Sequence, residues 1–149
     1  MDFDVVLADF GTAQDIGTPL QQLGDFKYIA PEIYTACDIE VENGGVPAAA
    51  LVRAGVPTAV SSDDLCRPSC DSWSVGCLVI YCLEGYAPFD LGEDAVFTAL
   101  RACWMQPTTQ HPRLWSPELT NFLSHCFERD ARLRPSADEL LEHPWVRGA

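Results

Sequence analysis

With 149 residues, of which 48% are apolar, including four Trp and seven Phe, the chain has the composition of a folded domain or part of one, not of a disordered protein. Nine basic against 22 acidic residues give a formal net charge of −13. This balance argues against a nucleic-acid partner, because a phosphate backbone is bound by clustered Lys and Arg. Basic peptides would be attracted, although an acidic surface that only keeps the protein soluble explains the charge equally well.

The first predicted element is a short strand over residues 5–8, an apolar and β-branched run followed by a turn at Gly11. From residue 12 to residue 27 the chain is polar and contains glycine and proline, which is typical of a loop. Residues 35–69 have a different composition, and within them only residues 47–54 favour a short helix. We expect the rest of that segment to be a loop.

Two helices are predicted after this loop. Residues 71–84 are apolar on nearly every face, so a helix there must be surrounded by protein. Residues 91–104 have the amphipathic pattern of a helix that lies on a surface. The first of these two is therefore expected to be the central, buried helix of the fold.

Two further helices have clear start signals. Ser116 precedes Pro117, which combines an N-cap hydroxyl with a proline at the first helical position. The stripe that follows is apolar at helical spacing and consists of Leu119, Phe122, Leu123, Cys126 and Phe127. The last helix is expected to open with a capping box of Ser136 and Glu139 and to end at Pro144. The predicted fold class is mainly α, with one strand and four to five helices.

The seven cysteines are odd in number and scattered, which argues against a disulfide framework. Those in apolar helical segments are interpreted as small buried hydrophobes: Cys77, Cys82, Cys103 and Cys126. Cys66 and Cys70 are not followed by ligands at zinc-site spacing, so we expect no metal there. The N-terminus lacks a signal-peptide pattern and no apolar run is long enough for a membrane span, so we expect a cytoplasmic location, with a nuclear one left open.

Several short motifs occur in one order along the chain. They are Asp9-Phe10-Gly11, Ala30-Pro31-Glu32, Asp71-x-Trp73-Ser74-x-Gly76, Arg134-Pro135-Ser136 and His143-Pro144-Trp145. One tripeptide recurs by chance, but this series in this order does not. From about residue 5 to residue 146 the chain therefore resembles the second half of the large, helical lobe of eukaryotic protein kinases of the Ser/Thr type.

The resemblance implies a partial kinase domain over residues 1–149. Residues 1–11 would be a strand with the Asp-Phe-Gly motif, and residues 12–34 an activation segment ending in Ala-Pro-Glu. Residues 35–69 would be an insertion longer than most kinases carry between these motifs, and residues 70–149 the helical lobe.

The resemblance assigns the nucleotide side of the site to Asp9, Phe10 and Gly11. Asp9 would hold Mg²⁺, which bridges the phosphates of ATP as the γ-phosphoryl group moves. ATP and Mg²⁺ are thus the implied cofactors, and a protein or peptide, basic to suit the charge of this chain, is the implied substrate. The alternative for Asp9 is an acidic turn residue without a metal.

The resemblance also implies that Glu32 pairs with Arg134 and ties the activation segment to the last helices. A guanidinium suits this role because its planar fork meets a carboxylate with two parallel hydrogen bonds. Asp71 and Trp73 would lie at the start of the central helix. In kinases the aspartate at the position of Asp71 bonds the catalytic loop, whereas in this chain we expect it to cap the helix.

Residues Gly24, Asp25, Phe26, Lys27 and Tyr28 match the loop that faces the substrate beside the phosphoacceptor. Ser/Thr kinases usually have threonine after the glycine, and Asp25 instead would place a negative charge near the transferring phosphate. Altered or absent catalysis in a complete parent is therefore an alternative. Thr12 and Thr18 lie in the activation segment, where phosphorylation orders a loop through arginine pairing, although ordinary loop hydroxyls are the simpler interpretation.

The residues before Asp9 supply no glycine-rich loop, strand lysine or catalytic loop, so we predict that this chain alone transfers no phosphoryl group. Three interpretations follow. The preferred one is a fragment of a Ser/Thr kinase whose N-terminal half is encoded elsewhere. The second is a catalytically inactive, kinase-derived interaction module. The third is a product that folds poorly because part of the surface between Trp73 and Leu83 would be bare.

Overall fold

The computed structural model describes residues 6–16, 25, 27–36, 67–89, 107 and 109–148. Within these ranges the order of elements is α1 (Pro31–Ala36), α3 (Ser69–Glu84), the 3-10 helix η2 (Pro112–Leu114), α5 (Pro117–Cys126), α6 (Ala137–Leu141) and α7 (Pro144–Arg147). The prediction of a mainly α fold is confirmed. The helices predicted at 47–54 and 91–104 lie outside the described residues. None of the helices described is both long and apolar enough to cross a bilayer.

The strand predicted at the N-terminus is not formed over residues 6–8, which have no regular secondary structure. A strand needs a neighbouring strand to satisfy its backbone groups, and the part of the chain described here contains no other. The side chains of Val6 and Leu7 are each 80% exposed. Although the segment is apolar, it is not buried, and the strand prediction is wrong for these residues.

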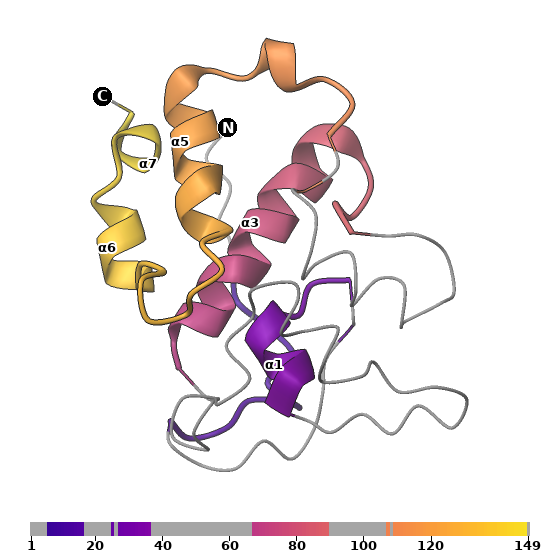
Figure 1. Cartoon of the computed structure of the whole chain (residues 1–149), viewed down its shortest axis with the longest axis vertical. Coiled ribbons are helices and arrows are strands. Elements are labelled where there is room, and N and C mark those ends of the chain that lie inside the picture. Colours follow the sequence, from indigo (N-terminus) through magenta and orange to yellow (C-terminus); the bar gives the residue numbers. More distant parts are fainter. Residues whose placement is uncertain are drawn as a thin grey trace.

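Helix α3 is the central helix of the described part: α5 and α6 pack against it, and α7 packs against α5 and α6. Figure 1 shows α5 beside α3, α7 beside α5, and α1 close to the first half of α3. The helix ends at Glu84 and is capped by Gly85, which has a φ of 81° and whose N–H donates to the carbonyl of Tyr81. Glycine is suited to this left-handed cap because it has no Cβ to strain.

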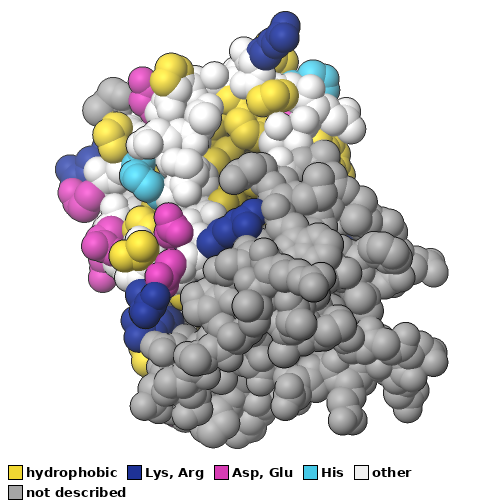
Figure 2. Space-filling view, in the orientation of Figure 1, with side chains coloured by type: hydrophobic (Ala, Val, Ile, Leu, Met, Phe, Trp, Pro, Cys, Tyr) yellow, Lys and Arg dark blue, Asp and Glu magenta, His cyan; other side chains and the backbone are white. Residues whose placement is uncertain are grey.

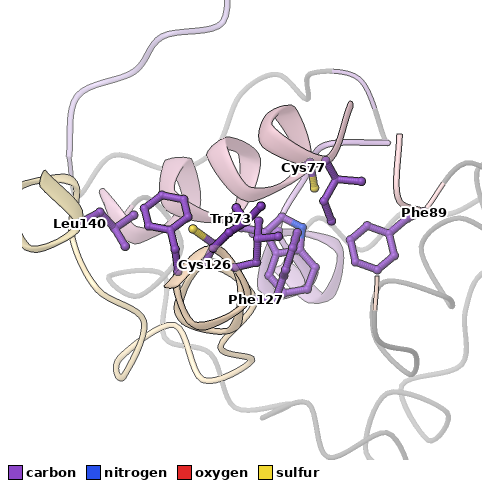
Figure 3. Close-up of a cluster of buried hydrophobic side chains, with 11 residues drawn as sticks. Trp73, Cys77, Phe89, Cys126, Phe127 and Leu140 are labelled. Carbon is purple, nitrogen blue, oxygen red and sulfur yellow. The ribbon is translucent and has the colours of Figure 1, made fainter. Parts of the chain in front are cut away.

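The core lies between α3 and α5 and is built around Trp73. Its ring is stacked 5.4 Å from Phe89 and meets Phe127 edge to face at 5.0 Å, and Phe89 and Phe127 are 5.7 Å apart (Figure 3). Such aromatic contacts add to the gain from burial alone. The predicted stripe of α5 faces this core, since all of its residues are buried: Leu119, Phe122, Leu123, Cys126 and Phe127.

The predicted start signals of the last helices are present. The Ser116 hydroxyl accepts the N–H of Leu119 at 3.1 Å, and Ser136 and Glu139 form the reciprocal capping box. The end of the last helix differs from the prediction. Helix α6 ends at Leu141, and a further helix, α7, begins at Pro144, because a proline has no N–H to continue a helix but fits the first position of a new one.

One face of α3 is exposed. Val75, Leu78 and Tyr81 are 41%, 54% and 46% exposed, although the sequence predicted a helix surrounded by protein. That prediction is wrong for this face, whereas the expectation of bare apolar surface between Trp73 and Leu83 is confirmed.

Figure 2 shows a different surface over the C-terminal helices at the left of the view, where acidic, basic and hydrophobic side chains are interspersed.

Gly76 marks the closest approach between α3 and the end of α5. A Cβ at this position would lie 2.7 Å from the Cβ of Cys126 and 3.0 Å from the Phe127 ring. We expect Gly76→Ala to lower the free energy of unfolding by about 1–3 kcal/mol through overpacking. Urea unfolding would measure this change. The control Val75→Ala, at a neighbouring exposed position, should change it by less than about 0.5 kcal/mol, and equal effects would contradict the packing described.

Candidate functional site

The centre of the candidate site is a buried ion pair between Glu32 and Arg134. Nη1 of Arg134 donates to Oε1 of Glu32 at 2.6 Å, and Nη2 donates to Oε2 at 2.9 Å. The side chain of Glu32 is 4% exposed and that of Arg134 is 0% exposed. The structure thus contains the predicted pair, with the two-point geometry that a guanidinium and a carboxylate permit.

The other groups around the guanidinium offset part of its desolvation. Its Nε donates to the carbonyl of Glu128 at 2.8 Å, and Nη1 also lies 3.1 Å from the carbonyl of Ser69. Its carbon centre lies 5.1 Å from the centroid of the Trp73 ring. A buried charge is tolerated when it is paired and hydrogen-bonded, and the ring contact adds a further favourable interaction. Because Ser69 and Trp73 belong to α3, the pair depends on α3 as well as on α1.

Local structure sets both partners. Pro31 begins α1 and places Glu32 in its first turn. Arg134 follows a tight turn in which the carbonyl of Asp130 accepts the N–H groups of Leu133 and Arg134. The two residues are 102 positions apart in the sequence. The ion pair therefore closes the longest loop that these contacts define.

Three serine hydroxyls and one thiol of α3 bind the segments around this pair. Ser69 and Ser72 donate to the carbonyls of Ala131 and Pro135 at 2.9 and 2.7 Å. On another face, Ser74 donates to the carbonyl of Tyr28 at 2.8 Å, and Cys70 donates its S–H to Oε1 of Glu32 at 3.4 Å. Sequence reasoning assigned none of these roles, because a hydroxyl on a helix does not reveal its partner.

The cysteines fall into two groups. Burial and the nearby Glu32 carboxylate raise the pKa of Cys70 to about 12, and burial raises the pKa of Cys126 to about 12 as well. Cys77 is also buried, as predicted, but Cys82 is exposed because it lies on the bare side of α3, so its predicted burial is wrong. Cys66 and Cys103 lie outside the described residues.

The loop predicted to face a substrate is described at three of its five positions. The carbonyl of Asp25 accepts the N–H of Tyr28 at 3.0 Å, and its carboxylate accepts the N–H of Lys27 at 3.0 Å. These two bonds close a tight turn, and Asp25 itself is exposed. Gly24 and Phe26 lie outside the described residues.

Asp9, Phe10 and Gly11 form an exposed turn of their own. Asp9 has a φ of 61°, and the carbonyl of Phe10 accepts the N–H of Ala13 at 3.1 Å. Mg²⁺ in nucleotide sites usually takes one or two carboxylates together with phosphate and water, so a single exposed aspartate fits one ligand position. Among the described residues no group of three candidate ligands could hold a metal by itself. Thr12 is exposed on the same turn, and Thr18 lies outside the described residues.

The two other predicted site residues differ in environment. Trp73 is buried beneath Arg134, as a structural role requires. Asp71 lies in the first turn of α3, but the N-cap is Pro68 and no side chain caps the helix. The expectation that Asp71 caps α3 is therefore wrong, because the helix begins two residues earlier than predicted. Desolvation raises the pKa of the Asp71 carboxyl.

Comparison with known proteins agrees with this geometry. The model of the protein kinase domain matches residues 56–146, well over half of the chain. Serine/threonine-protein kinase PKZ1 of Phytophthora infestans is 29% identical over 151 residues, which cover 97% of this chain and 31% of that protein. Calcium/calmodulin-dependent protein kinase cmkA of Emericella nidulans is 28% identical over 155 residues, which cover 99% of this chain and 30% of that protein. MAP3K epsilon protein kinase 1 of Brassica napus is 38% identical over 94 residues, which cover 62% of this chain and 7% of that protein. The chain spans less than a third of the length of each relative.

The ion pair yields a prediction for stability. Glu32→Gln leaves the buried guanidinium without a carboxylate, so we expect the free energy of unfolding to fall by about 3–5 kcal/mol. Urea unfolding would measure the loss. The double variant Glu32→Gln with Arg134→Met should lose less, because no unpaired charge remains. Arg132→Ala, which breaks an exposed pair with Asp130, should cost under about 1 kcal/mol and serves as the control. A loss for Glu32→Gln no larger than for this control would contradict the geometry.

The exposed pair yields a prediction for pH. Hydrogen bonds from Arg132 hold the pKa of Asp130 at about 2, below its ordinary value of 3.8. Because the folded value is depressed, this interaction stabilises the protein above pH 3.8 and is lost as the pH falls toward 2. The stability difference between the unmodified protein and Asp130→Asn should therefore be constant near neutrality and shrink in acid. Unfolding curves from pH 6 downward would measure it, and a difference unchanged at about pH 2 would refute the assignment.

Proposed function

Because this chain belongs to the protein kinase family, we propose that it is the C-terminal part of the large lobe of a Ser/Thr protein kinase. The complete protein would transfer the γ-phosphoryl group of ATP to a serine or threonine of a protein substrate. Relatives named as Ser/Thr and calmodulin-dependent kinases, aligned over nearly the whole chain, support this. In this proposal residues 12–34 are the activation segment and residues 70–149 the helical lobe.

The observation that carries the proposal is the buried, two-point pair of Glu32 and Arg134. It connects the Ala-Pro-Glu motif to the Arg-Pro-Ser motif across 102 positions. Such a pair keeps the segment that precedes Glu32 on a rigid base. Phosphoryl transfer relies on positioning together with electrostatic stabilisation, so a rigidly held loop suits the proposed chemistry.

Asp9 is the residue that would hold Mg²⁺ in the complete protein. When bound, the ion would neutralise phosphate charge during transfer. The contribution of this chain is a carboxylate on a turn whose Gly11 leaves room for it, since a Cβ there would lie 3.3 Å from Oδ1 of Asp9. We further propose that the N-terminal half of a kinase domain is a partner of this chain, that the substrate peptide is basic, and that the protein is cytoplasmic.

A catalytically inactive interaction module is the second candidate. The observation that favours it is Asp25, an exposed carboxylate in the substrate-facing turn that also accepts the Lys27 N–H. A negative charge there would repel the phosphate that is transferred. The two candidates differ in what they predict for a complete kinase that carries this segment.

A chimeric kinase tests the proposal. Residues 9–149 would replace the matching segment of Phytophthora infestans PKZ1, and phosphorylation of Ser/Thr peptides would be measured with radiolabelled ATP and Mg²⁺. We expect the folded chimera to be active and Asp9→Asn to lower its activity by about 100-fold or more, because the metal supplies several kcal/mol of stabilisation. The 149-residue chain alone should show no transfer above an Asp9→Ala control.

The position of Asp25 separates the two candidates in the same assay. Circular dichroism would first establish that each chimera is folded. A folded chimera that is inactive, and that gains activity with Asp25→Thr, would favour the inactive module. If the unmodified chimera and its Asp25→Thr variant are both folded and both inactive, the kinase proposal is contradicted.

A further inference from the structure

Ser74 joins α3 to the turn that the proposed function places next to the substrate. Its hydroxyl donates to the carbonyl of Tyr28 at 2.8 Å, across 46 positions of sequence. The carbonyl of Cys70, in the same helix, is 3.5 Å from that hydroxyl. Since a serine hydroxyl has one proton, the shorter bond to Tyr28 is the one that it makes.

The Tyr28 peptide groups are held on both sides. The N–H of Tyr28 donates to the carbonyl of Asp25, and the carbonyl of Tyr28 accepts from Ser74. Two residues further on, Ala30 is 1% exposed and leads into Glu32. The turn at residues 25–28 is therefore fixed through Tyr28 and does not rely on the ion pair alone.

Cys70 and Ser74 act from one face of α3. They are four residues apart, so their side chains lie above one another along the helix. Cys70 donates to Glu32 and Ser74 to Tyr28, so consecutive turns of α3 hold the two ends of residues 28–32. The other two serines bind the opposite segment, near Ala131 and Pro135.

We propose that Ser74 is a positioning residue for peptide recognition. Through the Tyr28 carbonyl it sets where the Asp25–Tyr28 turn lies relative to the helical lobe, and hence where the substrate residue beside the phosphoacceptor binds. The part of this inference that concerns the substrate rests on the proposed function. The part that concerns the turn does not, because it follows from the hydrogen bonds alone.

Ser72 provides a matched control. It lies two residues away on the same helix and donates to a backbone carbonyl at a similar distance, that of Pro135 at 2.7 Å. Ser72 is buried and Ser74 is half-buried. If the hydroxyls of α3 only stabilised the lobe, Ser72→Ala and Ser74→Ala would have the same consequences for residues 27–33. Positioning by Ser74 predicts different ones.

Hydrogen exchange on the 149-residue chain tests the positioning directly. We expect Ser74→Ala to accelerate amide exchange over residues 27–33 by about fivefold, the change expected for one hydrogen bond of typical strength. Ser74→Thr keeps the hydroxyl and should restore slow exchange. Ser72→Ala should leave residues 27–33 unchanged, and urea unfolding would show that the variants remain folded. Exchange that is unchanged in Ser74→Ala, not restored by threonine, or equally fast in Ser72→Ala would overturn the proposal.

The chimeric kinase tests the consequence for the substrate. Ser74→Ala should raise KM for the peptide by about three- to tenfold and change kcat by less than about twofold, because the interaction serves binding and not transfer. Ser72→Ala should change neither by more than about twofold. An equal fall of kcat in both variants would refute a role in recognition. A chimera that is folded but inactive would count against the proposed function, while the exchange experiment would still decide the role of Ser74 in the turn.

Discussion

A pair of opposite charges buried at the junction of three segments is the constraint on which this structure depends. Removing a carboxylate and a guanidinium from water costs several kcal/mol each, and the cost is recovered only if all their partners remain in place. Those partners are the first turn of α3, the Glu128 carbonyl and the Trp73 ring. Because Trp73 also stacks on Phe89 and Phe127, the same interaction couples the ion pair to the hydrophobic core.

The same rigidity extends to the loop before Glu32, which α3 holds at Tyr28 and at Glu32. Asp25 at the start of the loop is exposed, whereas Tyr28 and Ile29 are partly buried against the core and Ala30 belongs to it, so packing holds only the second half of the loop. Hydrogen bonds from α3 to Tyr28 and Glu32 act together with this packing. The turn that begins at Asp25 can then be exposed and still have a defined place relative to the helices.

Helix α3 has apolar residues on two sides, and only one of these sides faces the core. One side of the helix carries Trp73, Cys77 and Ile80, which face the core, while Val75, Leu78 and Tyr81 face away from it. An axial helix with apolar residues on both sides can organise structure on either side. The relatives PKZ1 and cmkA that align with this chain are more than three times as long.

Much of the fold could be predicted from the sequence alone, because its signals are local. A hydroxyl before Pro117, the capping box at Ser136 and the spacing of apolar residues determine helices through neighbours along the chain. The pairing of Glu32 with Arg134 is not local, and only the resemblance to protein kinases implied it. Only the tertiary structure decided the partners of Ser74 and Cys70, the exposure of Cys82, and the missing strand at residues 6–8. Each of these depends on which distant segment lies opposite a residue, and a backbone carbonyl or an absent neighbouring strand leaves no mark on the residue types nearby.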